Sequence, residues 1–225
     1  MATSDDDAVA AEPEASTIVA GAPWSARVVF IAEAYGVDEK KKFLSDVRRL
    51  ATQVFGPLRA QVGTNTSSWA LSSSDNDAPL AFAAALVAVD AVWLPSATSG
   101  VPRREDDLSK SSSSFEAAAA LPDRNRRRRR RRLGEETAFG LYRRASAPLR
   151  LVEPSPRSYA DARRACATAL KSRETCRRAT LVLLANDPYY GGLGDDVIVT
   201  TNSPTSGALA LRHELGSEWG IGPAP

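Results

Sequence analysis

Short apolar runs alternate with amphipathic stretches along this chain, which is the pattern of a sheet covered by helices. Runs of strand length, apolar throughout or on every second residue, predict strands at residues 28–32, 87–94, 149–152, 180–185 and 197–201. Apolar residues recurring at spacings of four, three and four predict a helix over 38–55 with a buried stripe of Phe43, Val47, Leu50 and Val54. The remaining helices are predicted at 158–173 and from residue 206 onward. Because strands alternate with helices, the sequence predicts an α/β fold.

Several stretches fall outside this pattern. Residues 1–26 are rich in Asp, Glu, Ala and Pro without apolar periodicity, which predicts a disordered acidic N-terminus. Composition further predicts a loop at 61–79, a low-complexity insertion at 103–134 and an irregular tail at 218–225. The length of the remainder suits one domain with its own core, expected over residues 27–217.

The net charge of +2 conceals a local asymmetry. Arg126 to Arg132 supply seven positive charges, and without them the chain carries −5. Adjacent like charges repel one another, so the tract is interpreted as part of an exposed, flexible excursion. The alternative is a patch for an import receptor or nucleic acid. No aromatic residues interleave with the arginines to stack on bases, which makes nucleic acid the weaker hypothesis.

The number of cysteines and the length of the apolar runs bear on the cellular location of the protein. Cys166 and Cys176 are too few for a disulfide framework and are interpreted as plain thiols, with pairing as the alternative. No apolar run has the length of a membrane span, so no membrane partner is expected. The N-terminus has neither the basic nor the apolar region of a signal peptide, and nothing in it directs export.

The only histidine of the chain, His213, opens the sequence His-Glu-Leu-Gly-Ser. In H-E-x-x-H metallopeptidases, two histidines four residues apart bind zinc from one helical face, and the glutamate activates the metal-bound water. Here Ser217 stands in place of the second histidine. One imidazole does not hold Zn²⁺ tightly, and Glu214 at the next position points to another face of the helix. A lone helical histidine that only hydrogen-bonds its surroundings is the alternative interpretation.

Several segments, taken in order, resemble the IgA-peptidase-type zinc metallopeptidases, a secreted family of the zincin class. The resemblance covers about residues 27–216, without 61–79 and 103–134. Its matching segments are Val29 to Tyr35, Lys42 to Leu44, Arg48 to Leu50, Val92 to Val101, Thr137 to Gly140, and Leu183 through Asn186, Tyr190 to Gly192 and Ser203-Pro204 to Gly216.

The resemblance implies a twisted mixed sheet whose edge strand lines a substrate cleft, with the helix carrying His213 just beneath it. It assigns the edge strand to Asp196, Val197, Ile198, Val199, Thr200 and Thr201. It implies zinc as the cofactor, with His213 as a metal ligand and Glu214 as the catalytic general base. A histidine inserted between Gly216 and Ser217 would restore the family's pattern, so the chain is interpreted as an incomplete zincin-like domain that lacks its C-terminal part.

Three functions follow as hypotheses. The first is a zinc-dependent endopeptidase by family, inactive as written, with a peptide or protein as substrate. The second is a non-catalytic relative that binds peptides along the edge strand. The third, and weakest, is a basic-tract protein acting through Arg126 to Arg132. The family is secreted while this N-terminus carries no signal, so localisation stays open.

Other polar residues have structural interpretations. Glu33 is expected to end a strand and cap the following turn rather than take part in chemistry. Tyr189 and Tyr190 are interpreted as packed loop anchors, with a place at the cleft mouth as the alternative. Asp195 and Asp196 form a weak cation pattern and are expected in a solvated turn.

Overall fold

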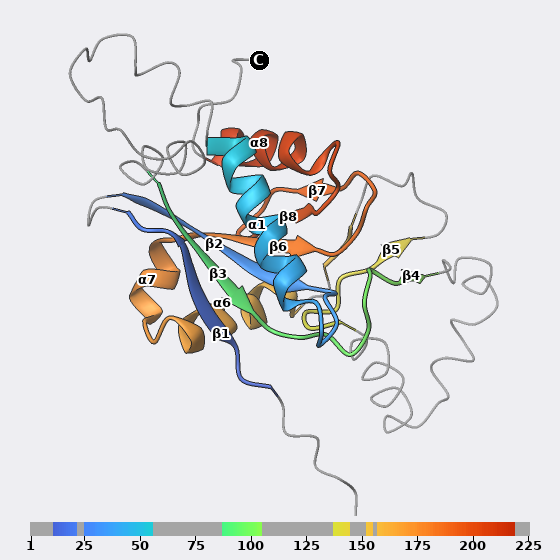
Figure 1. Ribbon diagram of the computed structural model, residues 1–225, viewed down its shortest axis with the longest axis horizontal. Helices are drawn as coiled ribbons and strands as arrows, with labels where there is room; N and C mark the ends of the chain where they lie inside the picture. Colours follow the sequence, from blue (N-terminus) through green and yellow to red (C-terminus); the bar gives the residue numbers. More distant parts are fainter. Residues whose placement is uncertain are drawn as a thin grey trace, which may run out of the picture.

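A six-stranded mixed sheet lies between two layers of helices in the computed structural model (Figure 1). The structure describes residues 11–21, 25–55, 87–104, 137–144, 152–154 and 157–218. The sheet is formed by β1 (Glu14–Val19), β2 (Ala26–Glu33), β3 (Val87–Trp93), β6 (Thr180–Ala185), β7 (Gly192–Leu193) and β8 (Ile198–Thr201). The helices are α1 (Lys40–Phe55), α6 (Ser158–Ala169), α7 (Arg173–Arg178) and α8 (Gly207–Glu218). A separate pair of short parallel strands joins β4 (Arg103–Arg104) to β5 (Arg143–Arg144).

The strands follow the order β1-β3-β2-β6-β8-β7 across the sheet. The four central strands are parallel, whereas β1 and β7 pair antiparallel at the two edges. Parallel neighbours need long connections. Helix α1 lies between β2 and β3, α6 and α7 precede β6, and residues 186–197, which include β7, lead from β6 to β8 without a helix. The predicted α/β class is confirmed.

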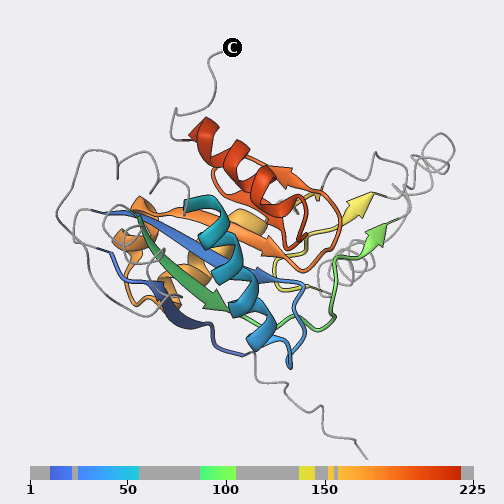
Figure 2. The same ribbon diagram turned by 45° about the horizontal axis from the view of Figure 1, so that its top comes forward.

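Both faces of the central strands are buried, which explains their continuous apolar sequences. Successive side chains of a strand point to opposite faces, so Phe30 belongs to the core under α1 and α8, while Val29 and Ile31 belong to the core under α6. The predicted stripe of α1, from Phe43 to Val54, is buried against the first of these cores. Figure 2 shows α1 and α8 side by side over one face of the sheet.

The N-terminal segment contains a strand, so the prediction of disorder over residues 1–26 is wrong for Glu14–Val19. This strand, β1, pairs antiparallel with β3, in register from Glu14 opposite Trp93 to Val19 opposite Val89, with one irregularity after Thr17. Its burial is partial, because it lies at an edge of the sheet. Composition suggested disorder because the acidic residues around the strand hide a short β-prone stretch. Residues 1–10 lie outside the described part of the chain.

Two other predictions change in detail. The helix expected over 158–173 is α6, which ends at Ala169, and the backbone then turns through Lys171, whose φ is +51°. A second short helix that was not predicted, α7, follows from Arg173. The predicted strand at 149–152 lies mostly outside the described residues, and Glu153 forms only an isolated bridge with Tyr142. The loop at 61–79, most of the insertion at 103–134 with its arginine tract, and residues 219–225 also lie outside them.

Cys166 and Cys176 form a disulfide, so their interpretation as plain thiols is wrong. The turn between α6 and α7 brings the two Cα atoms to 5.9 Å, within the range that a disulfide spans. Both residues are buried in the core beneath these helices. A spacing of ten residues in the sequence says nothing about this distance, which depends on how the two helices pack.

The disulfide should contribute measurably to stability. Reducing it, or replacing both cysteines by alanine, is expected to lower the free energy of unfolding by about 2–3 kcal/mol, because the crosslink restricts a short loop of the unfolded chain. Urea denaturation with and without a reducing agent measures this. The double alanine variant is the control, since its stability should not respond to the reducing agent. Equal denaturation midpoints for oxidised and reduced wild type would contradict the prediction.

Candidate functional site

Helix α8 carries the His-Glu pair and begins at Gly207, after a turn of residues 202–206 that follows β8. Gly207 is its first residue, and a Cβ there would overlap the carbonyl oxygen of Thr201, so only glycine allows the chain to turn this closely. The Gly207 N–H donates to the carbonyl of Ser203 at 3.0 Å. Leu211 and Leu215 are buried against the sheet and form the inner face of this helix.

The two residues of the pair occupy different sides of α8. His213 is exposed, on the outer surface of the helix. Glu214 is half-buried and lies against the loop that contains β7, because a Cβ at Gly192 would come within 3.4 Å of its Oε1 and one at Gly194 would overlap its carboxylate. Ser217, one turn after His213, is also exposed, and its hydroxyl donates to the His213 carbonyl at 3.2 Å.

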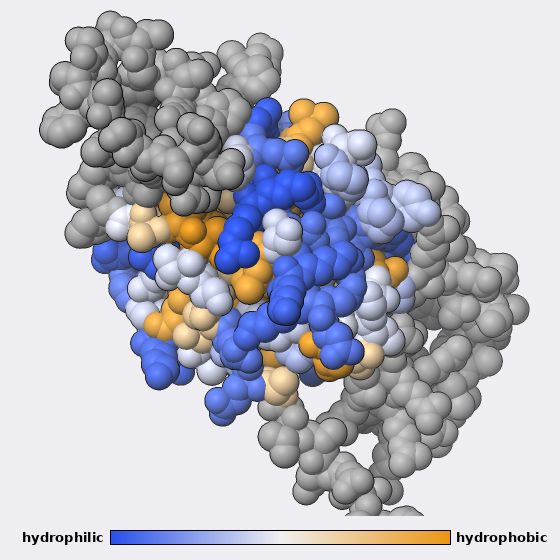
Figure 3. Space-filling view, in the orientation of Figure 1, coloured by the Kyte–Doolittle hydropathy of each residue, from blue (hydrophilic) through white to orange (hydrophobic). Residues whose placement is uncertain are grey.

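The surface around this helix is mainly polar. Figure 3 views the face covered by α1 and α8, which is largely hydrophilic with separate apolar spots. Leu209 is the exposed large apolar side chain of α8, and the exposed Arg212 and His213 lie beyond it along the helix. Within the described ranges, no group of three His, Cys, Asp or Glu residues could hold a metal ion.

The strand assigned to the sheet edge is not the edge, and this part of the prediction is wrong. Residues 198–201 form β8, which has β6 on one side and β7 on the other. Asp196 lies in an exposed bend before it, as expected for a solvated turn, and Val197 is already buried. The edge is β7, where Gly192 pairs with Thr200 and Leu193 with Val199. A two-residue strand in a glycine-rich loop has no periodicity, so sequence analysis overlooked it.

A buried ion pair holds the loop that leads into β7. Nε of Arg143 lies 2.5 Å from Oδ2 of Asp187, and their side chains are 1% and 5% exposed. The same guanidinium donates to the carbonyl of Tyr190 at 3.0 Å, and the hydroxyl of Thr201 donates to the carbonyl of Tyr189 at 2.7 Å. Removing one partner of a buried ion pair generally costs about 3–5 kcal/mol, so this contact fixes the loop firmly.

The tyrosines of this loop are anchored through their backbone. Their side chains are 49% and 43% exposed, for Tyr189 and Tyr190 in turn, so the interpretation of them as packed anchors is wrong. Both side chains lie on the surface next to the edge strand β7, and the Arg143 guanidinium donates to the carbonyl of Tyr190. Two aromatic side chains with a fixed backbone are suited to contact a bound segment.

A network of asparagines closes the carboxyl ends of β6 and β8. The Asn186 amide donates to Glu39 and to Ser99, each at 3.1 Å. The Asn202 amide donates to Asp46 at 2.9 Å and to the Asn186 side-chain oxygen at 3.1 Å. In open α/β sheets this end, where strand order reverses, is the usual place for a ligand. Here the protein's own side chains fill it, and no buried side-chain polar atom of the described residues lacks a partner.

Glu33 ends β2 and is fully buried. Its carboxylate accepts the N–H groups of Phe139 at 2.8 Å and Leu141 at 2.9 Å. It therefore holds a loop more than a hundred residues away, which extends the predicted role of capping the next turn. Burial raises the pKa of Glu33 from 4.5 to about 7, although hydrogen bonds from Thr137, Leu141 and Phe139 act in the opposite direction.

Sequence analysis gave no role to Arg143, Asp187 or Asn202. Asp187 follows a strongly apolar strand, and that position at the carboxyl edge of a sheet is a signal for a functional or bridging polar residue. Arg143 has no comparable signal, because its partner is 44 residues away in the sequence.

Comparison with models of known protein families gives no match for this chain. No curated protein matches it either. Of the helices that the structure describes, none combines the length and apolar character needed to cross a bilayer. The resemblance to zinc metallopeptidases therefore rests on the matching residues alone.

Glu33 should make stability depend on pH. Between about pH 4.5 and 7 the unfolded chain releases a proton that the folded protein keeps, so rising pH favours unfolding. The contribution of Glu33 is complete below pH 4.5 and is lost by pH 7, a change of about 3 kcal/mol. Urea denaturation at a series of pH values measures the slope.

The variant Glu33→Gln should remove this slope. It should also be less stable at every pH, because its amide nitrogen would face an N–H donor. Asp38→Asn is the control, since Asp38 is an exposed carboxylate in the turn before α1, and it should keep the wild-type slope. An unchanged slope in Glu33→Gln would show that another group is responsible.

Proposed function

We propose that this chain is a relative of the IgA-peptidase-type zinc endopeptidases that binds extended peptides at the edge of its sheet without cleaving them. The observation that carries the proposal is the contact between α8 and β7. The helix with the His-Glu pair lies beside an antiparallel edge strand, which is the arrangement that the resemblance implies, although the edge strand is formed by other residues.

The edge strand supports binding of an extended segment. An edge strand has backbone N–H and C=O groups that no neighbouring strand uses, and a peptide can pair with them as an added strand. On its other side, β7 is fixed to β8 and to the loop that Arg143 anchors. Tyr189 and Tyr190 are exposed next to it. A rigid edge with two aromatic side chains lowers the entropic cost of binding.

The donor set does not fit a zinc centre. Catalytic zinc takes three protein ligands and keeps one position for water. The chain has a single histidine, and its two cysteines are joined to each other. Near His213, the described residues offer no group of three ligands, and Glu214 faces β7 while His213 faces solvent. Glu214 consequently has no metal-bound water to activate, and the proposed function is binding.

Zinc affinity tests the interpretation of His213. The wild-type chain is expected to retain no stoichiometric Zn²⁺ after dialysis. The variant Ser217→His places a second imidazole four residues after His213, on the same exposed face of α8. Its affinity should rise about tenfold or more, because even second-shell changes alter metal affinity by about 10- to 100-fold. Calorimetric titration with Zn²⁺ measures both proteins.

Ser217→Gln is the matched control, since it changes the same position without adding a ligand of comparable strength. It should behave as wild type. One tightly held zinc ion per wild-type chain would contradict the proposed loss of the metal site.

Peptide binding is tested with an immobilised library of eight-residue peptides and the full-length chain. Wild type should capture a subset of the library and leave every peptide intact by mass spectrometry. Replacing Tyr189 and Tyr190 by serine should weaken capture about tenfold, because aromatic side chains at a binding centre commonly contribute at least about 1.4 kcal/mol.

Two control variants locate the binding. Val37→Ser removes an exposed apolar side chain elsewhere, 69% exposed, and should leave capture unchanged. Ser16→Pro alters β1, the opposite edge of the sheet. Loss of capture with Ser16→Pro but not with the tyrosine variant would place binding at β1 and contradict the proposal, as would cleavage of captured peptides.

A further inference from the structure

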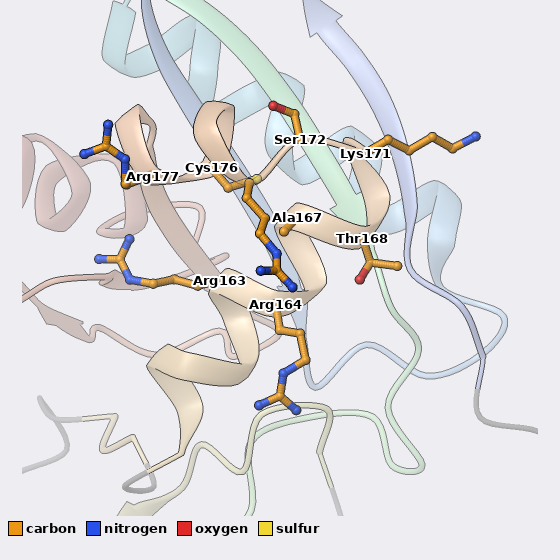
Figure 4. A pocket seen from close by; sticks show the side chains of 9 residues that line it. Arg163, Arg164, Ala167, Thr168, Lys171, Ser172, Cys176 and Arg177 are labelled. Atoms are coloured by element: carbon orange, nitrogen blue, oxygen red, sulfur yellow. The ribbon is translucent and has the colours of Figure 1, made fainter.

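The face of the sheet opposite α8 carries a basic pocket between α6 and α7. The pocket has a volume of about 700 Å³. Its charged lining consists of Arg163, Arg164, Lys171, Arg173 and Arg177, and no acidic or aromatic residue lines it. Figure 4 shows Arg163 from α6 and Arg177 from α7 extending to the same side, while Arg164 and Lys171 extend in other directions.

Some of these cations already have carboxylate partners on the surface. Arg163 lies 3.8 Å from Asp196, and Arg177 lies 2.8 Å from Glu174. Arg164 lies 3.3 Å from Asp161, and all six side chains are substantially exposed. Exposed ion pairs contribute little, so a ligand can replace them at small cost. Of the described acidic residues, none lies within ion-pair distance of Lys171 or Arg173. The cations that line the pocket thus outnumber the neighbouring carboxylates that pair with them.

The scaffold of this pocket is rigid. The disulfide between Cys166 and Cys176 joins the two helices, and Cys176 forms part of the lining. Lys171, with φ of +51°, sits in the tight turn between them. Ser172 begins α7, and its hydroxyl accepts the N–H of Thr175 at 3.1 Å. Cations held on a preorganised frame lose less entropy when they bind an anion.

We propose that the α6–α7 pocket binds an acidic saccharide bearing sulfate or phosphate groups. The volume suits two or three sugar units rather than a single inorganic ion. Arginine and lysine pair with tetrahedral oxyanions, and Thr168 supplies a hydroxyl at the pocket wall. This site is independent of the proposed peptide edge, because α6 and α7 cover the other face of the sheet.

Two observations favour a saccharide over a nucleic acid. Single-stranded nucleic acid is held largely by stacking of bases on aromatic side chains, and the lining contains none. The disulfide points to an oxidising compartment, where structural disulfides persist and where nucleic acid is not the usual polyanion.

The test uses the full-length chain and a heparin-derived tetrasaccharide, with binding measured by calorimetry. The double variant Lys171→Asn/Arg173→Gln should bind about tenfold more weakly, as expected for the loss of two exposed charge pairs. Asparagine is chosen because it tolerates positive φ. The control Lys41→Gln/Arg48→Gln removes the same charge from exposed positions of α1, on the other face of the sheet, and should stay within about twofold of wild type.

The arginine tract at 126–132 can also attract polyanions, so the site is located directly. Phenylglyoxal labelling read by mass spectrometry should show protection of Arg163, Arg173 and Arg177 by the tetrasaccharide, whether or not the tract is protected too. Protection of the tract alone, or equal losses in both double variants, would overturn the proposal. Equal or tighter binding of tetrathymidylate at the same arginines would overturn the assignment to a saccharide.

Discussion

The structure depends on burying four parallel strands on both faces. Such strands have no solvated side, so every polar group where they end needs a partner from the protein itself. Glu33, Asn186 and Asn202 lie at those ends. The Glu33 carboxylate accepts hydrogen bonds from a distant segment, and the amides of Asn186 and Asn202 donate hydrogen bonds to distant segments. The carboxyl end of the strands, where an α/β sheet usually binds a ligand, is thereby filled by the protein's own side chains. The candidate sites lie instead at the edge strand β7 and on the helices that cover the sheet.

The buried ion pair of Arg143 and Asp187 lies just after the carboxyl end of β6. A charged pair in the interior is stable only when its remaining hydrogen-bonding groups are satisfied, and Arg143 meets this by binding the backbone of the tyrosine loop. The short strand β7 begins directly after that loop. One interior contact therefore holds the backbone of the loop from which the side chains of Tyr189 and Tyr190 are exposed.

The two proposed sites lie on different faces of the sheet and have different chemistry. On one, α8 lies beside the edge strand, and its single imidazole faces solvent without further metal ligands among the described residues. On the other, a disulfide-linked pair of short helices presents arginines and lysine around a pocket. The two proposed sites share no residue, so binding of a peptide at one does not exclude an acidic glycan at the other.

Local patterns in the sequence determined the α/β class, the central strands and the inner face of α1, since burial on a regular element leaves a periodic trace. They also singled out His213 and Glu214, which the structure places on different sides of one helix. Only the tertiary structure decided that β7 is the edge, that β1 joins the sheet, that the cysteines pair, and that Arg143 meets Asp187. Each of these depends on how separate elements pack against one another, and such contacts leave no periodic signal in a single sequence.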